Sequence, residues 1–166
     1  MVLALLLGAT ACGGGGGGAT APEIPGVVVE RAASRSHREG TIDYPKHPPS
    51  GGDHNPTPVT CGFYSQQPPD EFAVHSLEHG AVWIAFSPSL STQDVAGLRA
   101  FAMLDHVLVT PYDGMSVPIT LVAWERRLEV QSVSDPRIKQ FVDAFRNGPT
   151  APERGSACTG VGHPAS

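Results

Sequence analysis

Prolines and glycines are concentrated in residues 40–72, and they limit what this chain can fold into. Proline has no backbone donor and fixes φ, so we expect no helix and no central strand in this stretch. A loop of this length is uncommon inside a compact domain and usually carries function when it is ordered. The prolines are Pro45, Pro48, Pro49, Pro56, Pro58, Pro68 and Pro69. Because His47, His54 and Cys61 lie among them, we expect an ordered, functional loop.

Length and charge exclude some classes of protein. The chain has 166 residues, which suits one ordinary domain. Its net charge of −5 argues against a nucleic-acid partner, because such partners favour a basic face.

The first residues resemble a bacterial lipoprotein signal. An apolar run over 2–7 is followed by small residues and Cys12, and glycines then fill 13–18. This order predicts a lipid on Cys12 and a flexible tether, which would anchor the protein outside the cytoplasm without spanning the membrane. The alternative is a cytosolic protein with a chance apolar start.

Two cysteines remain after Cys12, namely Cys61 and Cys158. In an exported protein, an even number of remaining cysteines predicts a disulfide. The alternative is a pair of thiolate metal ligands, although their spacing matches no zinc-finger pattern.

Regular structure is expected mainly after the proline-rich stretch. The clearest helix begins at the capping residue Asp135 with Pro136 in its first turn, and it ends at Gly148. Its apolar residues recur at i, i+3, i+4 and i+7, which places them on one face. A second helix is expected from Ser91, with its capping serine and an acid three residues later. The expected strands cover 81–86, 106–110, 119–124 and 128–131, with a short edge strand at 27–29.

These elements predict an α+β domain in which two helices pack on a small mixed or antiparallel sheet. We expect the chain to divide into a signal segment at 1–12, a glycine-rich tether at 13–26, the domain at 27–160 and a flexible tail at 161–166.

His75 and His79 are the strongest candidates for chemistry. In a helix, residues four apart share a face with Cβ atoms roughly 5–6 Å apart, so two imidazoles can bind one metal ion. In a strand the pair would lie about 13 Å apart. Gly80 is a natural helix terminator and favours a short helical turn here. The glycine turn before His54 can bring a third imidazole, whereas the alternative is that these histidines only satisfy loop carbonyls.

The letters from His75 to His79 also fit the H-x-x-E-H pattern of inverted zinc proteases. A zinc-dependent hydrolase with Glu78 as general base is therefore an alternative function. The context argues against it, because those motifs lie inside long helices and a strand follows Gly80 directly. Glu78 then orients a histidine or caps the turn. A further alternative is a structural or partner-binding surface domain without metal.

The choice of metal depends on the other ligands. Beside His54, His75 and His79, the weaker candidate ligands are His37, which precedes the loop, and Met115, which lies in a turn rather than on a core stripe. If Met115 joins the histidines, copper is favoured, because thioethers suit Cu(I). A cluster of imidazoles and a carboxylate alone would favour zinc. Our leading hypothesis is a copper-binding lipoprotein that holds or hands over metal.

Several motifs in order resemble the bacterial domain of unknown function DUF3105. The resemblance covers about residues 27–160. Its motifs are Pro48-Pro49-Ser50-Gly51-Gly52-Asp53-His54-Asn55-Pro56, Cys61-Gly62-Phe63-Tyr64, Val74-His75-Ser76-Leu77-Glu78-His79-Gly80, Pro111-Tyr112, Ala123-Trp124 and the Cys158 tail.

The resemblance implies a secreted or membrane-attached protein and supplies no reaction. By resemblance, signature positions are occupied by His54, His75, Glu78, His79, Cys61 and Cys158. Two residues depart from the pattern. Asp53 replaces the usual small residue or proline, and Glu125 replaces the usual glycine after Ala-Trp, which changes the demands on that turn.

Overall fold

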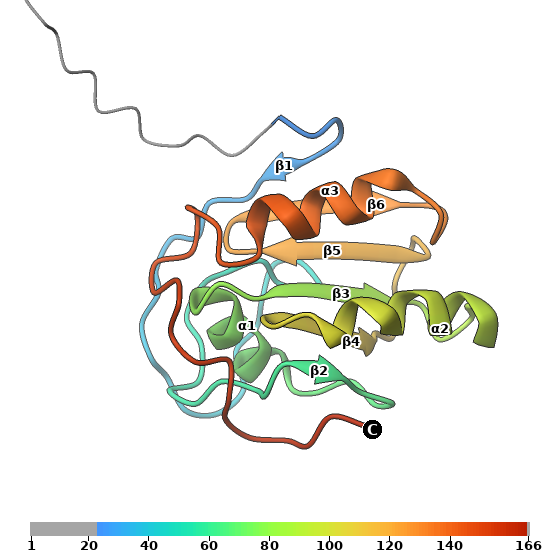
Figure 1. Ribbon diagram of the computed structural model, residues 1–166. Coiled ribbons are helices and arrows are strands. Elements are labelled where there is room, and N and C mark those ends of the chain that lie inside the picture. The colour runs from blue at the N-terminus through green and yellow to red at the C-terminus, as the bar shows by residue number, and fades with distance from the viewer. Residues whose placement is uncertain (1–22, 166) are drawn as a thin grey trace, which may run out of the picture.

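The computed structural model describes residues 23–165 (Figure 1). The predicted signal segment, Cys12 and most of the predicted tether lie outside these residues. Ile24 already packs into the core, three residues before the predicted start of the domain. Among the described helices, none is both long and apolar enough to cross a membrane.

A six-stranded mixed sheet forms the centre of the domain, in the order β1-β6-β5-β3-β4-β2. Strand β3 pairs in parallel with β4 and antiparallel with β5, and β4 also pairs in parallel with β2. Strand β6 pairs antiparallel with both β5 and β1. The strands are β1 Val28–Val29, β2 Gly62–Phe63, β3 Val82–Phe86, β4 Val107–Pro111, β5 Ile119–Ala123 and β6 Arg126–Val130. The predicted α+β class with a mixed sheet is confirmed.

Helices cover both faces of this sheet. Helix α2 (Thr92–Arg99), which a 3₁₀ turn over Ala100–Met103 continues, and helix α3 (Pro136–Phe145) lie on one face (Figure 1). Helix α1 (Asp70–Glu78) lies on the other face and extends the turn predicted around His75. It begins inside the stretch expected to be loop, directly after Pro69, because proline is accommodated at a helix start.

Strand β3 is buried on both faces, which explains its continuous apolar run. Its alternate residues Val82, Ile84 and Phe86 join the core beneath α2 and α3. Trp83 and Ala85 point to the opposite face and join the core that contains α1 residues. The sheet therefore separates two cores, and α1 is held over the second one.

The loop and the C-terminal segment are fastened together on the α1 face. The predicted Cys61–Cys158 disulfide is confirmed, with the two Cα atoms 5.5 Å apart, so these cysteines are not thiolate ligands. Beyond it, Val161 pairs with Val59, and the Ala165 amide donates to the Phe63 carbonyl at 2.7 Å. The segment predicted to be a flexible tail is thus bonded to the domain as far as residue 165.

Candidate metal centre

The end of helix α1 carries the predicted histidine pair. The rings of His75 and His79 lie 4.5 Å apart between centroids, and their Nε2 atoms lie 2.9 Å apart. Glu78 is also on this last turn and is almost completely buried. The helical alternative for this segment is therefore correct, and it places two imidazoles together as the spacing predicts.

The loop brings a third imidazole, His54, to this helix end, and the segment before the loop brings a fourth, His37. His37 and His54 face each other in a parallel bridge, in which the Arg38 amide donates to the His54 carbonyl at 2.7 Å. The His54 ring lies 4.9 Å from the His75 ring, and the His37 ring stacks on His75 at 4.9 Å. A backbone contact between two segments that precede the helix in the sequence thus delivers two side chains to it.

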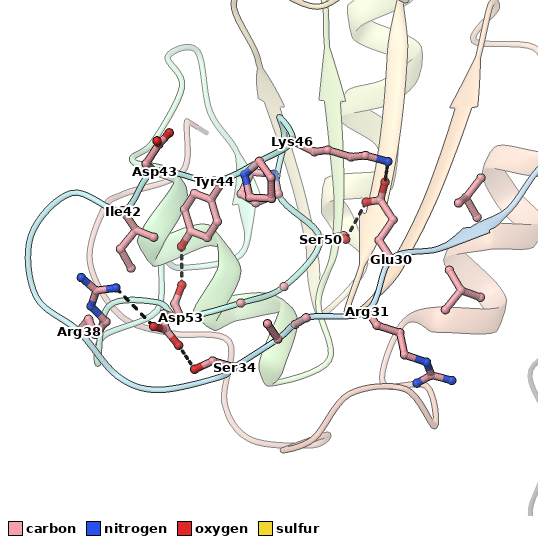
Figure 2. A pocket seen from close by; sticks show the side chains of 18 residues that line it. Glu30, Arg31, Ser34, Arg38, Ile42, Asp43, Tyr44, Lys46, Ser50 and Asp53 are labelled. Carbon is pink, nitrogen blue, oxygen red and sulfur yellow. Dashed lines mark hydrogen bonds and ion pairs between the residues drawn. The ribbon is translucent and has the colours of Figure 1, made fainter.

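Asp53 fixes the two segments that form this bridge. Its carboxylate accepts a hydrogen bond from the Ser34 hydroxyl and pairs with Arg38 (Figure 2). It also accepts from the Ser36 amide at 2.9 Å. These bonds lower the pKa of Asp53, with the Ser34 hydroxyl as the largest cause. On the other side, the Tyr44 hydroxyl donates to the Asp53 carbonyl at 2.7 Å. The departure from the family pattern at this position therefore has a structural role.

A pocket of about 600 Å³ lies between these two parts of the chain and is lined by residues 28–34, 38, 42–46 and 49–53 (Figure 2). Gly51 and Gly52 form part of its wall, and the Gly52 carbonyl accepts from the His54 ring. The pocket thus lies beside the histidine cluster, with the glycine turn between them.

Four candidate ligands converge within one small volume. The ligand atoms of His37, His54, His75 and Glu78 all lie within 4.8 Å of one another. Zinc–nitrogen and zinc–oxygen bonds of about 2.0–2.2 Å place tetrahedral donors roughly 3.5 Å apart, so modest closure would suffice for one ion. The predicted meeting of His54 with the helix turn is therefore present in the structure.

The orientation of the rings is set by backbone carbonyls. A carbonyl oxygen only accepts, so each bonded Nδ1 carries the proton and Nε2 of a neutral ring has a free lone pair. Three rings share this arrangement, with bonds from His54 Nδ1 to Gly52 O at 2.8 Å, from His75 Nδ1 to Asn55 O at 2.6 Å and from His79 Nδ1 to Ala157 O at 2.8 Å. Metal-binding histidines use their second nitrogen in this way.

The unprotonated Nε2 atoms consequently face other hydrogen-bond acceptors instead of donors. The His54 Nε2 atom lies 2.9 Å from Glu78 Oε2, and the Nε2 atoms of His75 and His79 make the same kind of contact. Two lone pairs at this distance repel unless a cation, either a proton or a metal ion, lies between them. The arrangement is thus suited to binding a positive charge.

Burial disfavours the charged form of the central imidazole, His75. Desolvation is the largest cause that lowers the pKa of His75 below its ordinary value, and the neighbouring imidazoles lower it further. The hydrogen bond to the Asn55 carbonyl opposes this shift. A neutral imidazole is the form that binds a metal ion.

The side chains of the cluster differ in their exposure to solvent. The side chains of His54 and Glu78 are 0% and 4% exposed, whereas His37 is 49% exposed. Arg35 lies beside His37 and places its guanidinium 3.7 Å from Glu78 Oε1. On the other side, His79 has Glu153 as a neighbour, with Nε2 and Oε2 3.6 Å apart.

The other sequence predictions fall in different places. Met115 is partly buried and packs against the core on the α1 face, so its role as a ligand stays a prediction. Glu78, which the sequence suggested as an orienting residue or a base, belongs to the ligand group itself. Sequence reasoning missed Arg35 and Glu153, because nothing in their local sequence indicates proximity to the histidines.

Comparison with known proteins identifies a family but no function. The sequence model of a family described as "Protein of unknown function (DUF3105)" matches residues 36–160. No curated protein and no solved structure matches the chain.

Proposed function

This chain belongs to the DUF3105 family of proteins of unknown function, and we propose that it binds a divalent transition-metal ion through His54, His75 and Glu78, with His37 as the fourth ligand. One observation carries the proposal. Imidazoles whose Nδ1 atoms are held by backbone carbonyls direct their Nε2 lone pairs toward one another and toward a buried carboxylate. A folded protein would not keep such acceptors together without a cation to compensate them.

The donor set favours Zn(II) or Cu(II) over Cu(I). Three imidazoles and a carboxylate are nitrogen and oxygen donors, which suit zinc and oxidised copper, whereas Cu(I) prefers sulfur. Copper was the first choice from the sequence, but the group contains imidazoles and a carboxylate without Met115, so we propose Zn(II), with Cu(II) as its rival. Cu(II) should bind more tightly, because it stands above zinc in the general order of divalent affinities.

Holding or handing over metal is favoured over hydrolysis. Glu78 would have to remain free of the ion to serve as a general base, yet its carboxylate lies within the ligand group and makes a 2.9 Å contact with His54. A purely structural role for the histidines would be favoured by dispersed imidazoles. The described cluster is instead compact, so metal binding is the better proposal.

We propose that the domain works outside the cytoplasm, tethered to the membrane through lipid on Cys12. The disulfide supports this location, because such bonds persist in oxidising compartments. The lipid itself rests on the sequence pattern around Cys12.

Calorimetric titration of the metal-free protein with Zn(II), Cu(II) and Cu(I) tests the proposal. We expect one divalent ion per chain with a Kd below about 1 μM, which corresponds to roughly −8 kcal/mol. His75→Ala should remove most of the binding. His163→Ala is the matched control, because His163 is an exposed imidazole outside the cluster. Absence of any binding tighter than micromolar would refute the proposal.

A further inference from the structure

Candidate ligand atoms continue past the four-residue group toward the C-terminal segment. From His75, the series passes to His79 Nε2 at 2.9 Å and then to Glu153 Oε2, which lies 3.6 Å from His79 Nε2. The four residues His37, His54, His75 and Glu78 are here called the inner group. With His79 and Glu153 added, the donors outnumber those that a four-coordinate ion uses. The additional pair, His79 and Glu153, is here called the outer pair.

The fold holds the outer pair in place through the segment 153–158. The Glu153 amide donates to the Glu78 carbonyl at 3.0 Å, and the Gly155 amide donates to the His79 carbonyl at 3.2 Å. The Ala157 carbonyl accepts from the His79 ring, and the next residue, Cys158, is covalently bound to the loop. The position of the outer pair therefore follows from several contacts and a disulfide.

The two sides of the inner group differ in charge. On the His37 side, the guanidinium of Arg35 pairs with Glu78 and repels an approaching cation. On the His79 side, Glu153 presents a carboxylate that is 49% exposed, and His79 itself is 13% exposed. An incoming cation is thus attracted on one side and repelled on the other.

We infer that His79 and Glu153 form an outer metal position through which a divalent ion enters and leaves the inner site, with His75 shared between the two positions. The ion would first meet the exposed carboxylate and then move inward from His79 to His75. This inference rests on the proposed function and adds the route of exchange to it. Free ions and small chelators would reach the site by the same path.

Stopped-flow kinetics with Zn(II) test this route. The experiment measures loading of the metal-free protein and removal of bound Zn(II) by a chelating dye, for the wild type and for Glu153→Gln. Because an entry position lowers the barrier in both directions, we expect both rates to fall by roughly three- to tenfold. The equilibrium Kd should change by less than about twofold, since the resting ligands are intact. Glu129→Gln on β6, an exposed carboxylate in another part of the sheet, controls for the change in net charge.

The visible spectrum of the Co(II)-substituted protein provides an independent readout. Glu153→Gln should leave the resting spectrum unchanged, because Glu153 is not a ligand of the inner site. Rates equal to those of the control variant would overturn the inference while the proposed function stands. A changed resting spectrum with weakened affinity would also overturn it, because Glu153 would then be a permanent ligand. A wild-type protein that binds no metal would overturn both.

Discussion

The Nε2 atoms of His75 and His79 lie 2.9 Å apart, while the Nδ1 atom of each ring is held by a backbone carbonyl. Neither ring can turn its lone pair away without losing the bond on its other side. The contact is thus imposed by the fold, and a cation placed between the rings would relieve the repulsion.

Removing the positive charge beside Glu78 should strengthen metal binding. Arg35 pairs with Glu78 at 3.7 Å and competes with a metal ion for the same carboxylate. Because the guanidinium is 62% exposed, solvent screening limits the gain to about 1 kcal/mol or less, or up to roughly fivefold in Kd. Calorimetric titration of Arg35→Gln with Zn(II) measures this effect. Lys139→Gln on α3, which also removes one exposed cation, should leave the Kd unchanged.

The metal-free protein should lose stability as the pH falls below about 6.5, the ordinary pKa of histidine. Burial depresses the pKa of His75 in the folded state. At pH values between the folded and the unfolded pKa of His75, the unfolded chain therefore binds more protons than the folded one. The contribution of His75 to the free energy of unfolding is therefore fully present above its unfolded pKa, and it declines as the pH falls toward its folded pKa. Urea unfolding at several pH values between about 8 and 5 measures the slope.

His75→Gln provides the comparison for this pH dependence. The variant cannot titrate at this position, so its free energy of unfolding should vary less steeply over the same range. An identical slope in both proteins would show that His75 does not contribute to it.

A left-handed backbone at Glu125 should make this position favour glycine. Its φ is +57°, in the region that side chains avoid, and it lies where the family resemblance implies glycine. The carboxylate compensates by accepting from the Ala32 amide at 3.1 Å. Glu125→Gly and Glu125→Val both remove that bond, but glycine adopts a positive φ readily, whereas valine does not. Chemical denaturation should find the valine variant less stable than the glycine variant by about 1–2 kcal/mol. Equal stabilities would contradict the proposed role of the backbone.

Replacing the predicted lipid acceptor should release the protein from the membrane. If Cys12 carries the lipid, Cys12→Ser removes the anchor and leaves the domain untouched. Cell fractionation with detection of the protein in the medium measures this release. Retention of the variant in the membrane fraction would contradict the lipid anchor, and unchanged Zn(II) binding by the released protein would show that the site does not depend on it.

Local sequence patterns predicted several elements and their order. The capping Asp135, the following proline and the apolar stripe predicted α3, and the continuous apolar run predicted β3. The spacing of His75 and His79 also determined that they share a helix face once a helix forms. These features depend on neighbours within one or two turns, so the amino-acid sequence contains the information directly.

Contacts between distant segments were decided by the tertiary structure. The bridge between His37 and His54 depends on the path of two irregular segments, and no periodic pattern encodes that path. The same is true of Glu153, which reaches His79 because the C-terminal segment crosses the end of α1. The sequence by itself thus identified histidines as candidate ligands and determined that two of them lie together. Only the folded chain decided which further donors and which opposing charge surround them, because long-range packing positions those groups.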